Sequence, residues 1–142
     1  APLFAALPLD EAMTAIVVAE PVGGEPARVV ESLDLAPELM AGLWLYVDDL
    51  DRSHAISQNI DTPTGAFWHA IMHRREGDFS NSHYWFRKVG EHPVFGKIGH
   101  DYDPHRVIDE AQATHQSSEV SPNLVDLQRR EWLALFQWCA NP

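Results

Sequence analysis

The stretch Thr62 to Gly77, TPTGAFWHAIMHRREG, decides the fold, because it carries both the start and the stop signal of one helix. Thr62 is a favourable N-cap residue, and Pro63 suits the first helical position, where its missing N–H is not needed. Gly77 readily adopts the left-handed conformation that ends many helices. The stretch therefore predicts a helix from Pro63 to about Glu76.

A second helix is predicted directly after this stretch. Phe79 and Tyr84 flank Ser80 at the positions of a hydrophobic staple, which fixes the entry of the chain into a helix. Gly90, followed by Pro93, is typical of a helix end. We therefore expect a helix from Ser80 to about Gly90.

Apolar residues also recur at helical spacing upstream of Thr62, after Pro37, which suits the first turn of a helix. The stripe continues to His54, so the His54 side chain is expected to point inward. Its apolar members are Leu39, Leu43, Val47 and Leu50.

Helix starts of the same kind occur twice more, at Asp103-Pro104 and at Ser121-Pro122. The segment DEAMTAIVVAE at 10–20 favours a helix, with a strand over 15–19 as the alternative, and the turn-like PVGGEP follows it. Strand signals are otherwise sparse. The sequence predicts an all-α protein, with residues 1–142 in one domain built as an irregular helical bundle of about five helices.

The composition excludes several classes of protein. A chain of 142 residues that is 45% hydrophobic has enough apolar side chains for a core, unlike a disordered chain. The single cysteine, Cys139, cannot form an intramolecular disulfide, which favours a cytoplasmic location and a small buried apolar role. No apolar run approaches the roughly 20 residues that span a bilayer, and the N-terminal APLFAALPL lacks the basic region of a secretory signal. We expect no membrane association.

The formal net charge of −11 is unevenly distributed. Residues 1–51 carry one arginine against ten acids, residues 52–90 five basic residues against three acids, and residues 91–142 four against eight. An acidic chain without a basic stripe repels phosphate backbones, so nucleic acid is not an expected partner. The locally positive middle segment suits one small anion.

Three potential ligands share one face of the helix predicted from Pro63 to Glu76. With His69 at zero on a helical wheel of about 100° per residue, His73 lies at about +40° and Glu76 at about −20°. Gly65 and Ala66 lie near the same face one turn earlier, where a ligand or another backbone could approach.

Two histidines four residues apart can bind one metal ion, and His54 would add a third imidazole. The sequence thus predicts that His54, His69 and His73 bind a divalent transition metal such as Zn, Ni or Fe, with Glu76 or Asp51 as carboxylate. The HExxH peptidase motif is absent. The alternatives are a metal-free polar site and histidines that are only structural.

Two arginines beside these ligands suggest a substrate. The guanidinium groups of Arg74 and Arg75 could orient a carboxylate or phosphate next to His73, and Glu76, Arg74 and Arg75 are the catalytic candidates. The leading hypothesis is a metal-dependent hydrolase or lyase acting on a small acidic substrate. The alternatives are a metal-free module that binds a small anion or sugar, and an interaction protein. For the arginines themselves, the alternative is ion pairing with the many acidic residues.

The remaining histidines are interpreted as surface or capping residues unless the fold brings two of them together. They are His83, His92, His100, His105 and His115. In the aromatic run Tyr84-Trp85-Phe86, Trp85 and Phe86 are expected in the core, and the remaining ring is free to line a pocket.

The strings SHAISQNIDTPTGAFWHAIMHRREGDFSNSHYWFRKVGEHPVF resemble a family of uncharacterised bacterial and fungal proteins with a nearly continuous WHxIMHRREGDF core. The similarity covers about residues 43–96. The resemblance implies kinship and points to the helix from Pro63 to Glu76 as important, and it implies no particular reaction, cofactor or catalytic residue.

Overall fold

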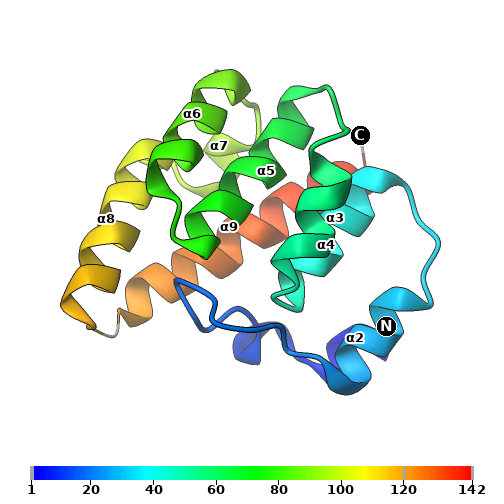
Figure 1. The fold of residues 1–142 in the computed structure, drawn as a ribbon. Helices are drawn as coiled ribbons and strands as arrows, with labels where there is room; N and C mark the ends of the chain where they lie inside the picture. Colours follow the sequence, from blue (N-terminus) through cyan, green and yellow to red (C-terminus); the bar gives the residue numbers. More distant parts are fainter. Residues whose placement is uncertain (1, 120, 142) are drawn as a thin grey trace.

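Nine α-helices and one 3-10 turn make up the regular structure of residues 2–119 and 121–141, which the computed structural model describes, and these residues contain no strand (Figure 1). The all-α class is confirmed, whereas the expected number of about five helices is wrong. The elements in chain order are α1 (Pro2–Ala6), η1 (Leu9–Glu11), α2 (Gly24–Glu31), α3 (Pro37–Tyr46), α4 (Leu50–Ser57), α5 (Pro63–Glu76), α6 (Phe79–Val89), α7 (Phe95–Ile98), α8 (Pro104–Ser117) and α9 (Pro122–Ala140).

The excess of helices over the prediction has two causes. Helices α1, α2 and α7 have only 5, 8 and 4 residues, too few for a clear periodic pattern. In addition, the apolar stripe that begins at Leu39 is divided between α3 and α4. Asp48 lies between them with φ of 61°, a left-handed conformation that a helix cannot contain.

The segment at 10–20 forms neither the favoured helix nor the alternative strand. Only η1 is helical there, and residues 12–23 run without regular structure across the other helices (Figure 1). The backbone oxygens of Met13 and Ala15 accept hydrogen bonds from Gln128 Nε2 at 2.9 and 3.1 Å. Because Gln128 of α9 and Arg75 of α5 donate to these backbone oxygens, the oxygens have hydrogen-bond partners without a helix.

The strongest helix predictions are confirmed. Helix α5 has the predicted bounds, with the Thr62 hydroxyl accepting from Gly65 N and with Gly77 at φ of 87°. Helix α6 is also found, but its N-cap is Asp78, whose carboxylate accepts from Asn81 N. The helices that begin at Pro104 and Pro122 are capped by Asp103 and Ser121 as expected.

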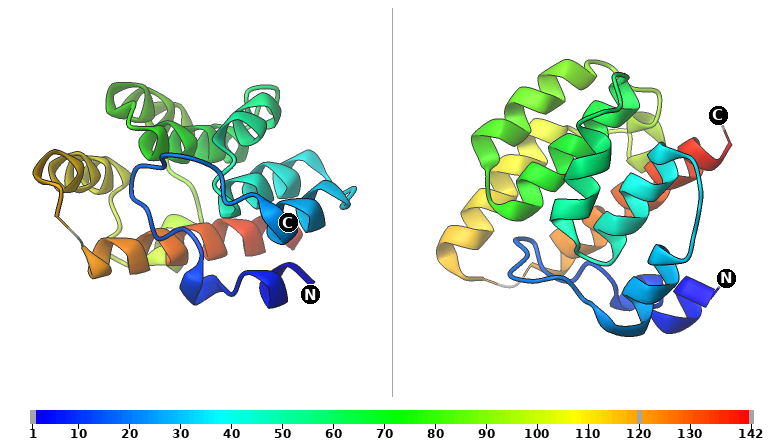
Figure 2. Two further views of the ribbon diagram at one scale, coloured as in Figure 1. Left: turned by 60° about the horizontal axis from the view of Figure 1, so that its bottom comes forward. Right: turned by 45° about the vertical axis from the view of Figure 1, so that its right-hand side comes forward.

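Helix α5 lies at the centre of the molecule. It packs between α4 and α6 and also contacts α3, while α9 crosses beneath and contacts α3, α7 and α8 (Figures 1 and 2). The centre of the core is aromatic, with Trp68 and Trp132 fully buried. Trp132 Nε1 donates to Gly42 O at 2.7 Å, and a Cβ atom on Gly42 would lie 2.7 Å from the Trp68 ring, so Gly42 permits this packing.

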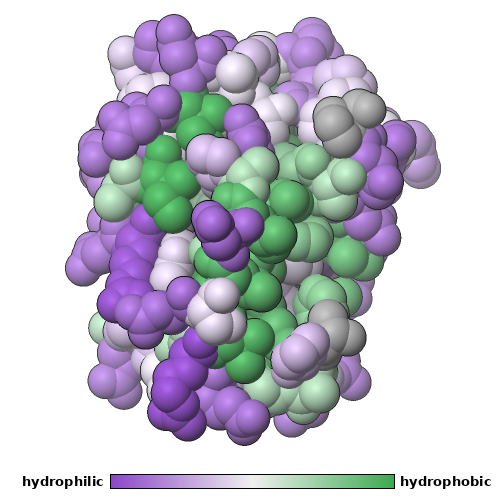
Figure 3. All heavy atoms as spheres, turned by 90° about the vertical axis from the view of Figure 1, so that its right-hand side faces the viewer, coloured by the Kyte–Doolittle hydropathy of each residue, from purple (hydrophilic) through white to green (hydrophobic). Residues whose placement is uncertain are grey.

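Apolar residues gather in the middle of one face of the molecule. Figure 3 shows them surrounded by hydrophilic residues on the side that lies at the right of Figure 1. Phe4, Val22 and Leu35 are large apolar side chains that stay exposed. Cys139 is half-buried against the core, and burial raises the pKa of its thiol to about 11.

Candidate metal centre

The histidine cluster, defined as His54, His69 and His73, depends on the turn between α4 and α5. Helix α4 ends at Ser57, and the chain folds back so that α5 starts at Pro63. Gly65 makes this turn possible, because a Cβ atom there would lie 2.3 Å from the backbone oxygen of Ile60. Gly65, which was expected beside a ligand or another backbone, thus lies against the backbone of Ile60.

The three imidazoles of the histidine cluster converge between α4 and α5. One ring nitrogen from each residue lies within 4.8 Å of the other two. The ring centroids of His54 are 4.8 Å from His69 and 5.5 Å from His73, and those of His69 and His73 are 4.7 Å apart. His54 thus lies within side-chain reach of His69 and His73, as its predicted role as a third ligand requires. This geometry can hold a metal ion.

Glu76 joins the histidine cluster through His73. The Oε2 atom of Glu76 lies 2.5 Å from His73 Nδ1, and 41% of its side chain remains exposed. A carboxylate can only accept, so His73 Nδ1 carries the hydrogen, and in a neutral ring Nε2 then keeps a free lone pair. This carboxylate–histidine contact is the one that orients metal-binding histidines in many proteins.

Asp78 forms a second group of potential ligands with His73 and Glu76, again with one atom from each within 4.8 Å. Its two carboxylate oxygens accept from the backbone and side-chain nitrogens of Asn81 at 3.3 and 3.2 Å. Asp78 therefore caps α6.

His69 is the most protected member of the histidine cluster. Its residue is 4% exposed, and the Trp85 ring stacks on the imidazole with centroids 3.9 Å apart and planes tilted by 17°. Burial, followed by the charges that His73 and His54 would carry, lowers the pKa of His69 to about 4. His69 is thus neutral at ordinary pH, the form that binds metals. Trp85 is only partly buried, while Phe86 is in the core as expected.

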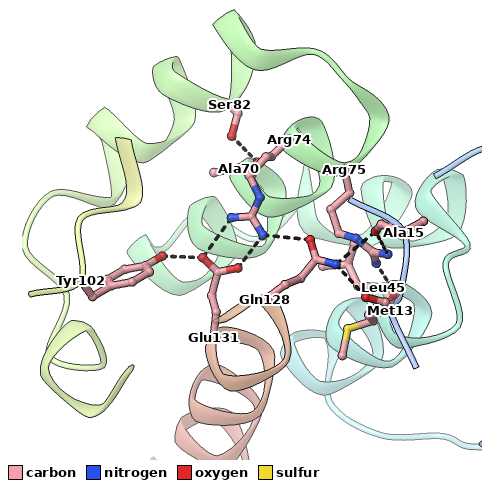
Figure 4. Close-up of polar contacts among 10 residues, drawn as sticks. All are labelled: Met13, Ala15, Leu45, Ala70, Arg74, Arg75, Ser82, Tyr102, Gln128 and Glu131. Atoms are coloured by element: carbon pink, nitrogen blue, oxygen red, sulfur yellow. Dashed lines mark hydrogen bonds and ion pairs between the residues drawn. The ribbon is translucent and has the colours of Figure 1, made fainter. Parts of the chain in front are cut away.

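Arg74 and Arg75 lie away from the histidine cluster, although they follow His73 directly. Each successive residue is rotated by about 100° around a helix, so these side chains leave α5 on its inner side. Both are 1% exposed. Arg74 binds Glu131 of α9 through two hydrogen bonds of 2.7 and 3.0 Å (Figure 4). Arg75 binds Asp48 at 2.7 Å.

These contacts leave the arginines no access to a ligand at the histidine cluster. Burial alone would lower the pKa of Arg74, but the charge and hydrogen bonds of Glu131 outweigh it and raise the pKa. Tyr102 donates to the same carboxylate at 2.5 Å. The structure therefore does not support the expected role of Arg74 and Arg75 in orienting an acidic substrate, and both make the ion pairs that were the alternative interpretation.

Two features escaped the sequence interpretation. His92 is 7% exposed rather than a surface residue; its Nε2 lies 3.0 Å from Thr64 Oγ1, and its Nδ1 accepts from Val94 N. His83 and His105, 22 residues apart, come into direct contact. No periodicity signals either feature, because each depends on how helices and loops meet in space.

Comparison with known proteins gave no match to any family model, curated protein or solved structure. The resemblance to proteins with the WHxIMHRREGDF core stays a prediction. Among the described residues, no helix combines the length and apolar character needed to cross a bilayer.

Proposed function

We propose that the protein binds one divalent transition-metal ion through His54, His69 and His73. The observation that carries this proposal is the convergence of three imidazole nitrogens within 4.8 Å of one another. Imidazole suits Zn, Ni and Fe, and the proposal is limited to ions of this kind. Glu76 would hold His73 in the tautomer that leaves Nε2 free for the ion.

The lack of other partners supports metal binding over a purely structural role. Within residues 2–119 and 121–141, neither His54 nor His69 forms a ring hydrogen bond, whereas His73, His83, His92 and His105 do. His69 is buried and His54 is only partly buried, and the protein leaves the ring nitrogens of both free to bind an ion. A shared ion would satisfy the nitrogens that the histidine cluster turns toward one another.

The reaction class follows from the number of ligands. Three protein ligands are typical of catalytic zinc sites, in which water or substrate takes the remaining position. Such an ion would polarise water or a carbonyl group, which is the chemistry of a metal-dependent hydrolase or lyase. An acidic substrate would need a cation other than Arg74 or Arg75, because both are paired in the core.

Elemental analysis tests the proposal. Protein purified without a histidine tag, stripped with a chelator and exposed to Zn, Ni or Fe(II), is expected to retain close to one equivalent after desalting. His54→Ala, His69→Ala and His73→Ala should each lose it. His100→Ala, at an exposed turn residue, is the matched control and should retain it. A wild type that stays empty with all three metals would exclude the proposal.

A further inference from the structure

His83 on α6 and His105 on α8 form a contact that the proposed metal centre does not use. Their Nδ1 atoms are 2.8 Å apart, and their ring planes are tilted by 1°. The ring centroids are 5.1 Å apart, a distance that exceeds the Nδ1–Nδ1 distance by about the sum of the two ring radii. The two Nδ1 atoms thus lie nearly on the line between the ring centres and point at each other.

Asp109 determines which ring donates in this contact. Its Oδ1 atom lies 3.0 Å from His83 Nε2, so this nitrogen carries a hydrogen, because a carboxylate only accepts. In a neutral His83 ring the Nδ1 atom is then an acceptor, and His105 Nδ1 must donate to it. A directed chain of hydrogen bonds runs from His105 through His83 to Asp109.

The distance fits a proton and excludes a metal ion between these two nitrogens. A metal lies about 2.0–2.1 Å from each imidazole nitrogen, so two nitrogens pointing straight at each other would have to be about 4 Å apart. The observed 2.8 Å is a hydrogen-bond distance.

We propose that the His83–His105 pair is a proton-operated latch between α6 and α8. The latch is closed while one proton lies between the two Nδ1 atoms. A first added proton binds His105 Nε2 and keeps this hydrogen bond, now charge-assisted. A second added proton can bind only His83 Nδ1, and two N–H groups then point at each other, which opens the contact.

The neighbouring charges set the pH at which the latch opens. Arg87 on α6 faces the pair as a cation, while Asp103, the N-cap of α8, and Asp109 on α8 face it as anions. Burial, followed by the charge that His83 would carry, lowers the pKa of His105. Two protons must be added before both Nδ1 atoms carry an N–H group, so the lowered pKa of His105 shifts the opening of the contact to a more acid pH.

Opening would affect the region around the histidine cluster, because α6 also carries Trp85, which stacks on His69. Only this consequence rests on the proposed metal centre. The latch itself can be tested in chelator-treated, metal-free protein, so the two proposals can fail separately.

The test compares the wild type with His105→Asn by amide hydrogen exchange of α6 at pH 7.5 and pH 5, corrected for the intrinsic exchange rate. The asparagine amide does not titrate, and it can donate to a bare His83 Nδ1 through its nitrogen or accept from a protonated one through its oxygen. In the wild type, protection of α6 should fall by about tenfold or more, the factor that corresponds to one pKa unit. His105→Asn should keep its protection at pH 5, and the control His100→Asn should behave as the wild type.

Equal loss of protection in the wild type and His105→Asn, or no loss in the wild type, would overturn the latch. If His105→Asn does not fold, nitrogen NMR of wild-type imidazoles decides. At pH 7.5 we expect a protonated Nδ1 on His105 and a bare, hydrogen-bonded Nδ1 on His83. Independent titration of the two rings would contradict the proposal.

Discussion

Glu76 shows how a single residue can adjust the proposed metal centre without being one of the three histidines. It contacts His73 Nδ1, on the side of the ring away from the lone pair that would bind the ion. We expect Glu76→Gln to weaken metal binding by about 10- to 100-fold, because a neutral amide holds the imidazole less firmly than a carboxylate does.

Competition with a chromophoric chelator measures this affinity. Glu110→Gln is the matched control, since Glu110 is an exposed glutamate of α8, and its affinity should equal that of the wild type. Unchanged affinity in Glu76→Gln would show that the contact with His73 does not contribute to binding.

A second residue-scale prediction concerns the ion pair between Arg74 and Glu131, in which both side chains are 1% exposed. Glu131→Gln leaves the guanidinium charge buried without its carboxylate, and we expect a loss of about 3–5 kcal/mol in the free energy of unfolding. Urea denaturation followed by circular dichroism measures the change.

The matched control is Glu31→Gln, which removes a glutamate from a surface pair with Arg52 at 3.6 Å. Exposed pairs of this kind contribute about 0–1 kcal/mol. Similar losses of unfolding free energy in Glu131→Gln and Glu31→Gln would mean that the buried ion pair stabilises the fold no more than an exposed pair does.

At the scale of elements, the turn between α4 and α5 brings His54 to the two α5 histidines. A Cβ atom at Gly65 would lie 2.3 Å from Ile60 O, so Gly65→Ala must displace the turn that joins α4 to α5. We expect a cost of about 1–3 kcal/mol in unfolding free energy, together with weaker metal binding.

Gly96→Ala is the control for Gly65→Ala, because a Cβ atom at Gly96 in α7 would meet nothing within 4 Å. Alanine is also the better helix former, so this variant should be unchanged or slightly more stable. Thermal melts and zinc titrations of both variants provide the comparison. If both glycine variants bind zinc as the wild type does, the turn does not control the position of His54.

Elements with strong terminal signals were predictable from the sequence. Thr62 and Gly77 delimit α5 at the predicted residues because an N-cap oxygen and a left-handed glycine act within one turn of the chain. The break at Asp48 was not predictable, since Arg75, 27 residues away, binds its carboxylate there. Local propensity cannot report such a distant partner.

At the scale of the whole molecule, the stability should depend on pH through buried histidines. Burial lowers the pKa of both His69 and His92 in the folded state, while an unfolded histidine titrates near 6.5. Below that pH the unfolded chain binds more protons than the folded one, so acid favours unfolding. Stability is therefore expected to be fully present above about pH 6.5 and to decline as the pH falls toward 4.

Urea midpoints of metal-free protein between pH 8 and pH 4 measure this decline. His92→Gln should be less stable at pH 7, because Val94 N loses its acceptor, and its curve should be flatter below pH 6.5. His100→Gln, exposed in a turn, should follow the wild type. A His92→Gln curve parallel to that of the wild type would show that His92 is not protonated on unfolding in this range.

Only the part of the candidate site that lies on α5 was predictable from the sequence. The spacing of His69, His73 and Glu76 places them on one face of α5, whereas His54 lies on α4, beyond the unpredicted break at Asp48, and reaches the cluster through the turn before α5. The ion pair that keeps Arg74 in the core is made with Glu131, which is 57 residues away. A helical wheel gives the direction of such a side chain but not its partner.

A crystal structure of zinc-loaded protein, with anomalous data collected at the zinc edge, tests the central claim most directly. The expected result is one strong peak between α4 and α5, about 2.0–2.1 Å from a ring nitrogen of each of His54, His69 and His73. No peak at that position, or a fully occupied zinc held by other residues, would contradict the proposed metal centre.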